Sequence, residues 1–78
     1  MKYTLERGKR YGAWIQLSGV QTWASDDMVK QKFEDFGFQD INLQIRDEDD
    51  RIVIWGTWGK ANMTGEMPES VVYVEDAP

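Results

Sequence analysis

The sequence contains no cysteine and no histidine. Without cysteine the chain can form no disulfide and offers no thiolate nucleophile, which is consistent with a reducing compartment. Without histidine it lacks the side chain that most often carries acid-base chemistry near neutral pH. Zinc sites built from cysteine and histidine are excluded with them.

Long apolar stretches are missing as well. No stretch approaches the roughly 20 apolar residues of a membrane span, and the N-terminal MKYTLERGKRYG carries charges where a signal peptide needs apolar residues. We therefore expect a soluble, cytoplasmic protein without a membrane partner. The net charge of −5 also disfavours nucleic acid as a partner, because binding to it depends on neutralising phosphates.

The chain is rich in aromatic residues instead. Its 78 residues include four tryptophans, three tyrosines and three phenylalanines, and 41% of all residues are hydrophobic. This composition predicts one folded domain, residues 1–78, with a small core. Tryptophan carries a large apolar area, so four of them either complete that core or form a binding surface.

Residues 41–58 predict a β-hairpin. Apolar and polar residues alternate over 41–46, four carboxylates follow at 47–50, and β-branched and aromatic residues resume at 51–55. The adjacent carboxylates repel one another and predict a solvated turn. A turn of four residues predicts the pairs Ile45–Ile52 and Leu43–Ile54 on the core face, and Gln44–Val53 and Asn42–Trp55 on the other face.

Two further strands and a helix come before this hairpin. Residues 2–6 and 11–17 alternate and are joined by a glycine-containing turn, which predicts a second hairpin. Ser25 is a good N-cap, and the apolar period after it predicts a helix over 26–36 that ends before Gly37.

The C-terminal part completes the fold. Residues 59–70 have no period and are expected to form a loop, residues 71–74 a last strand, and residues 75–78 a frayed acidic tail. The order ββαβββ predicts an α+β fold: a two-layer sandwich with one helix on one face of a mostly antiparallel sheet of four to five strands. A split β-α-β arrangement would place the strand before the helix beside the second strand of the hairpin at 41–58.

The sheet face away from the helix carries the candidate binding residues. If Ile15 and Leu17 point at the helix, Trp14 and Gln16 point away from it. Exposed tryptophan favours binding, because it offers a large area with a polar handle. In the alternative, residues 59–70 or the terminal segments cover this face and bury its tryptophans. The candidates, including both tryptophans of the WGTWG segment, are Trp14, Gln16, Asn42, Gln44, Val53, Trp55 and Trp58.

No catalytic residue, metal ligand or cofactor is predicted. The carboxylates at 47–50 are contiguous, whereas a calcium loop spaces its oxygen ligands around a glycine bend. The segment 56–59 lacks the lysine and the following helix of a phosphate-binding loop, and the serines have no histidine to activate them. These patterns indicate that the protein is not an enzyme.

The leading hypothesis is a non-enzymatic module that binds another protein, as an inhibitor or an assembly factor. The carboxylates at 47–50 favour a partner with a basic surface. Two alternatives remain: a carbohydrate-binding module that stacks sugars on Trp55, Trp58 and Tyr73, and an acidic mimic of nucleic acid. A homodimer that hides the aromatic face is also open. In overall type, a compact, acidic chain without a catalytic set resembles the small accessory proteins of bacteriophages.

Overall fold

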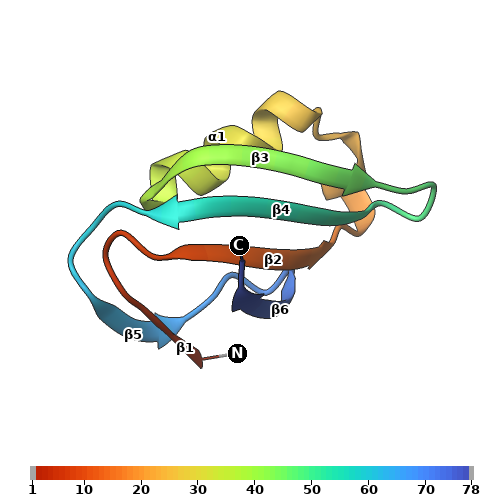
Figure 1. The fold of residues 1–78 in the computed structure, drawn as a ribbon. Helices are drawn as coiled ribbons and strands as arrows, with labels where there is room; N and C mark the ends of the chain where they lie inside the picture. The colour runs from red at the N-terminus through yellow and green to blue at the C-terminus, as the bar shows by residue number, and fades with distance from the viewer. Residues whose placement is uncertain (1, 78) are drawn as a thin grey trace.

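A computed structural model describes residues 2–77 of the chain. The elements run in the order β1 (Lys2–Leu5), β2 (Arg10–Gln16), the 3₁₀ helix η1 (Gly19–Trp23), α1 (Asp26–Phe36), β3 (Phe38–Arg46), β4 (Arg51–Trp58), β5 (Met63–Glu66) and β6 (Val71–Asp76). Strands β3, β4, β2 and β6 form one antiparallel sheet in that spatial order, and β1 pairs with β5 in a separate ribbon (Figure 1). The predicted α+β fold, with one helix on an antiparallel sheet, is confirmed.

The helix α1 has the predicted bounds. The Ser25 side chain accepts a hydrogen bond from the backbone amide of Met28 (3.2 Å), and two aspartates occupy the first turn. At the other end Gly37 has a φ of 134°, where a side chain would be strained. A Cβ there would also approach the Trp58 ring to 2.9 Å. Local capping therefore determines both ends of the helix.

The predicted split β-α-β arrangement is also confirmed. Strand β2 pairs with β4, with Ala13 opposite Ile54 and Ile15 opposite Ile52. All four side chains are buried and belong to one core cluster with Val29 of α1. The alternation of both strands dictates which side chains enter this cluster, because a slip of one residue would expose the whole apolar set.

The predicted hairpin between residues 2–6 and 11–17 is wrong. Strand β1 pairs with β5 instead, with Leu5 opposite Met63. Leu5 is fully buried in the core cluster, and the Tyr3 ring packs edge-on against Tyr11 at 5.8 Å. Through Leu5, and through Tyr3 and Met63 packed against the same cluster, the ribbon forms part of the core. Alternation identifies a strand, but it does not select the partner of that strand.

Two predictions about the C-terminal part are wrong as well, because pairing with strands distant in the chain cannot be read from the local pattern of residues. The expected loop at 59–70 contains β5, and the expected tail contributes Glu75 and Asp76 to β6. Long-range contacts order both segments. The hydroxyl groups of Thr4 and Thr64 lie 2.9 Å apart, and the Ala77 amide donates to the Arg10 carbonyl oxygen (3.0 Å).

The register of the hairpin β3–β4 is only partly as predicted. The pairs Leu43–Ile54 and Asn42–Trp55 are confirmed, whereas the observed pairs nearer the turn are Ile45–Val53 and Arg46–Ile52. The turn has three central residues and not four, since Asp50 adopts a left-handed φ of 57° and the Asp47 amide donates to the Arg51 carbonyl oxygen.

A bulge at Gln44 then restores the predicted register farther from the turn. The predicted pairs Ile45–Ile52 and Gln44–Val53 are therefore wrong. As a consequence, Ile45 lies on the face away from the helix, and Arg46 lies on the helix side.

Candidate functional site

An apolar row crosses the sheet face that points away from α1. The cross-strand partners are Ile45 and Val53, Val53 and Trp14, and Trp14 and Tyr73, so the row runs from β3 through β4 and β2 to β6. At the usual spacing between strands the row is about 14 Å long. The rings of Trp14 and Tyr73 meet edge-on, with centroids 6.3 Å apart at 80°. These four residues are called the apolar row below.

The apolar row is open to solvent. Exposed fractions are 47% for Trp14, 56% for Ile45 and 49% for Tyr73, and Val53 is half-buried. Within residues 2–77, α1 and the β1–β5 ribbon pack on the opposite face. The segment 59–70 does so too, since its Met67 is buried in that core. The alternative in which this segment buries the tryptophans does not hold.

The next row of the same face holds Trp55. Its cross-strand partners are Asn42 on β3 and Gly12 on β2, which in turn lies opposite Glu75. A Cβ on Gly12 would lie 3.1 Å from the indole of Trp55, so the ring lies directly over this glycine. Trp55 is therefore half-buried within the sheet surface, and it extends the apolar row without projecting from it.

The remaining candidates have different surroundings. Gln16 is tied to the hairpin turn, since its amide nitrogen donates to the carbonyl oxygens of Asp49 (2.8 Å) and Leu17 (3.0 Å). Asn42 and Gln44 are exposed, the latter in the bulge.

Trp58 does not belong to this face. It is 1% exposed, and its indole N–H donates to the Ala61 carbonyl oxygen (2.9 Å). Trp55 and Trp58 are three positions apart on one strand, so their side chains point to opposite faces. The alternation of side chains along the strand was a signal in the sequence that could have assigned Trp55 and Trp58 to opposite faces.

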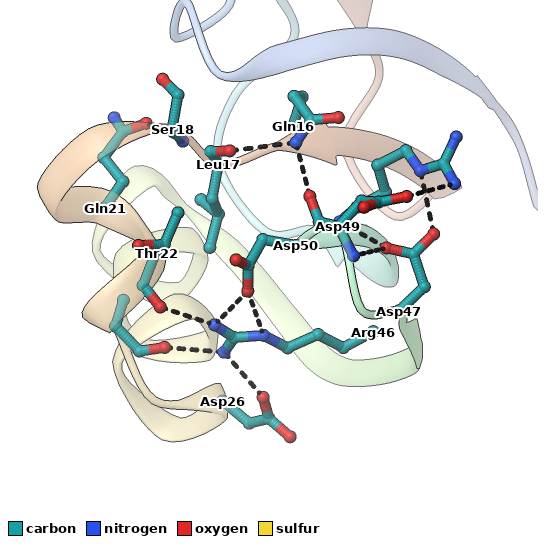
Figure 2. Close-up of polar contacts among 12 residues, drawn as sticks. Gln16, Leu17, Ser18, Gln21, Thr22, Asp26, Arg46, Asp47, Asp49 and Asp50 are labelled. Carbon is teal, nitrogen blue, oxygen red and sulfur yellow. Dashed lines mark hydrogen bonds and ion pairs between the residues drawn. The ribbon is translucent and has the colours of Figure 1, made fainter.

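Arg46 joins three parts of the chain on the helix side (Figure 2). Its Nη1 donates to the carbonyl oxygen of Ala24 (2.6 Å) and to Asp26 (3.1 Å). Its Nη2 donates to the Thr22 carbonyl oxygen (3.1 Å) and to Asp50 (3.0 Å). The hydrogen bonds to Asp50 and then Asp26 raise the pKa of Arg46 above its ordinary value. The three-residue turn places Arg46 opposite Ile52, whereas the predicted four-residue turn would have placed it opposite Arg51.

The acidic turn is paired internally. Arg51 donates to Asp47 (2.9 Å) and Asp49 (3.2 Å), and Asp50 contacts Arg46, so three of its four carboxylates lie against guanidinium groups. The hydrogen bond from the Arg51 backbone amide is the main cause that lowers the pKa of Asp47. In the described part of the chain, no group of three or more acidic residues is arranged to hold a metal ion.

The chain matches no protein-family model, and comparisons with curated proteins and with solved structures give no match. Among residues 2–77, no helix is both long enough and apolar enough to span a membrane.

Proposed function

We propose that this protein is a module that binds another protein, and that the partner docks on the apolar row. The observation that carries the proposal is the apolar row itself: four side chains lie side by side, one from each strand of the sheet, and three of them are exposed. A contiguous apolar patch on a small protein is a typical sign of an interface. Tryptophan and tyrosine are also the residues that most often dominate the binding energy of such surfaces.

The row is suited to a protein partner better than to a sugar. A sugar platform presents the flat face of an aromatic ring, whereas Trp14 and Tyr73 meet edge-on. Of the other rings expected to stack sugars, Trp58 is in the core and Trp55 lies over Gly12. The nearly parallel rings of Phe36 and Phe38 belong to the core side of the sheet and not to this face.

A protein partner on the apolar row is also better supported than a role as a mimic of nucleic acid. Such a mimic must present free carboxylates spaced like phosphates, but Asp47, Asp49 and Asp50 contact arginines of the same chain. The net charge of −5 still favours a partner with a basic surface, because long-range attraction speeds the encounter.

The test compares two tryptophans on opposite faces. Wild type, Trp14→Ala and the matched control Trp23→Ala are used to capture proteins from a cell lysate, and the purified captured protein is then titrated by calorimetry. We expect Trp14→Ala to weaken binding by about 30-fold, the effect of losing a hot spot worth about 2 kcal/mol. We expect Trp23→Ala, on the other side of the sheet, to leave the affinity for a partner docked on the apolar row unchanged.

Tyr73→Ala serves as a second variant, because its exposed ring can be removed with little effect on the core. The proposal is wrong if Trp14→Ala and Tyr73→Ala both fold, as shown by circular dichroism, and both bind the partner as wild type does. Binding of oligosaccharides, followed by tryptophan fluorescence, would favour the carbohydrate alternative instead.

A further inference from the structure

The 3₁₀ helix η1 has little hold on the rest of the fold through packing. None of its residues is buried, and among the apolar residues of the segment 18–24 only Ala24 packs against the core cluster. Its own hydrogen bonds are local, such as the one from the Ala24 amide to the Gln21 carbonyl oxygen (3.0 Å). Within residues 2–77, each hydrogen bond that joins this segment to a distant part of the chain comes from Arg46. One side chain therefore determines where η1 lies.

Arg46 uses every N–H donor of its guanidinium group at this position (Figure 2). Two of the donors reach the carbonyl oxygens of Thr22 and Ala24. The others are directed at the carboxylates of Asp26 in α1 and of Asp50 in the turn between β3 and β4. Hydrogen bonds between charged groups are stronger than neutral ones. The two carboxylates therefore fix the guanidinium group in the place from which it reaches η1.

The chain on either side of this segment is anchored independently of Arg46. Before it, the Leu17 side chain is buried in the core, and the Leu17 amide donates to the Asp50 carbonyl oxygen (3.1 Å). After it, Ser25 caps α1 through the amide of Met28. Loss of the contacts to Arg46 would therefore release η1 and leave both of its flanks in place.

Both ends of the segment have the backbone of a hinge. Ser18 and Ala24, the residues next to η1, are extended and interrupt the helical backbone. Gly19 has a φ of 58°, and a Cβ at this position would meet no atom within 4 Å. Glycine changes its backbone angles at low cost, and no neighbouring side chain obstructs it here. Hinges of this kind allow a short element to move as a unit.

The helix η1 forms one wall of an apolar groove of about 800 Å³, and α1 and the start of β6 form the other walls. Val20 and Trp23 line it from η1 and are exposed. Residues of its floor are buried in the core, among them Ile15, Leu17 and Val29. A change in the position of η1 therefore changes how much of this apolar surface meets water.

We propose that η1 is a lid on this apolar groove and that Arg46 is the latch that holds the lid closed. When the latch is released, the segment 18–24 moves away from the groove about its two ends, while the sheet and α1 keep their structure. Arg46 is thus a positioning residue. The lid lies on the side of the sheet opposite to the apolar row, so this inference is independent of the proposed function.

Hydrogen exchange of the backbone amides measures the opening of the lid. The amides of Gln21 and Ala24 report on η1, and the amide of Val29 reports on α1. Arg46→Lys keeps the positive charge, but an ammonium group has too few donors to replace the guanidinium group. We expect Gln21 and Ala24 to exchange at least about tenfold faster in Arg46→Lys than in wild type, because two charge-assisted hydrogen bonds are lost. The exchange of Val29 should be unchanged.

Asp26→Asn is the matched control. It removes one charged partner of the same guanidinium group but leaves both carbonyl oxygens of the lid as acceptors, so the lid should stay closed. Chymotrypsin gives a second readout, because a protease cleaves a segment that opens locally. Cleavage after Trp23, followed by mass spectrometry, should be faster in Arg46→Lys than in wild type and Asp26→Asn.

Asp50→Asn is a milder variant that tests the latch even if Arg46→Lys does not fold. Asparagine tolerates the left-handed φ of 57° at this position, but its neutral amide holds the guanidinium group less firmly. We expect a smaller increase in exchange at the same two amides, Gln21 and Ala24.

Three results would overturn the proposal. The amides of Gln21 and Ala24 could exchange as in wild type in both latch variants. They could lack protection in wild type already, which would show that nothing holds the lid closed. Exchange could also rise equally at Val29 and in the strands of the sheet, which would make Arg46 a support of the whole fold. Failure of the lid would leave the test of the apolar row unaffected, because that test uses Trp14→Ala and Tyr73→Ala on the other face.

Discussion

Trp58 should be the tryptophan on which stability depends most. It is 1% exposed and lies in an aromatic cluster, with ring centroids 5.1 Å from Phe38 and 5.7 Å from Phe36. Trp58→Ala removes these contacts and leaves a cavity between β4 and α1. Trp23→Ala makes the same chemical change at a surface position, so the two variants form a matched pair.

The two substitutions should lower the free energy of unfolding by amounts that differ severalfold. Replacing a buried aromatic residue by alanine typically costs about 3–5 kcal/mol, whereas a chain of this size is stable by only about 4–12 kcal/mol. Trp58→Ala should therefore remove at least about a quarter of the free energy of unfolding, and all of it if the wild type lies at the lower end of this range. Trp23 buries only a small part of a side chain of roughly 200 Å², so at about 25 cal/mol per Å² its removal should cost less than about 1 kcal/mol.

Urea unfolding followed by circular dichroism measures both costs. In a thermal scan, Trp58→Ala should lower the midpoint by more than about 15 °C, and Trp23→Ala by only a few degrees. Trp58→Phe keeps part of the packing and should fall between wild type and Trp58→Ala. A cost for Trp58→Ala below about 2 kcal/mol, or equal costs for Trp58→Ala and Trp23→Ala, would refute the assignment of one residue to the core and the other to the surface.

Two further predictions concern local structure. Ser25→Ala removes the acceptor for the Met28 amide and should lower the free energy of unfolding by about 1 kcal/mol; an unchanged urea midpoint would contradict the role of Ser25 as N-cap. Hydrogen bonds from the amides of Arg51 and Asp49 lower the pKa of Asp47 in the folded state, so its contribution to stability is present above the ordinary pKa of about 3.9 and is lost as the pH falls through the lowered value. Asp47→Asn should therefore flatten the acid side of the stability profile, measured as urea midpoints between about pH 5 and pH 2, and parallel profiles for variant and wild type would contradict this.

The helix and the central strands could be predicted from local residues. Ser25 and Gly37 determine the ends of α1 through contacts within a few residues of each end. The alternation of β2 and β4 was enough to assign their core face, and the order ββαβββ placed the two strands side by side as a split β-α-β arrangement. Trp14, Val53 and Trp55 were assigned to the face away from the helix on the same grounds.

Long-range contacts determined what the sequence could not show. Strand β5 exists through its pairing with β1, about 60 positions away along the chain. The position of Ile45 in the apolar row depends on the three-residue turn and on the bulge at Gln44, and neither changes the pattern of residues along the strand.

The two surfaces illustrate the same division. Alternation alone pointed to an aromatic face, because the side-chain period of a strand is local. The apolar groove between η1, α1 and the start of β6 could not be predicted from the sequence. Trp23 lies in a segment without a period, and the buried residues of the groove come from β2, α1 and the region around β6. The sequence by itself determined which residues form the helix and which strand faces are apolar, because capping and alternation act over a few residues. Only the tertiary structure decided which of those faces stay uncovered, because that depends on how segments distant in the chain pack together.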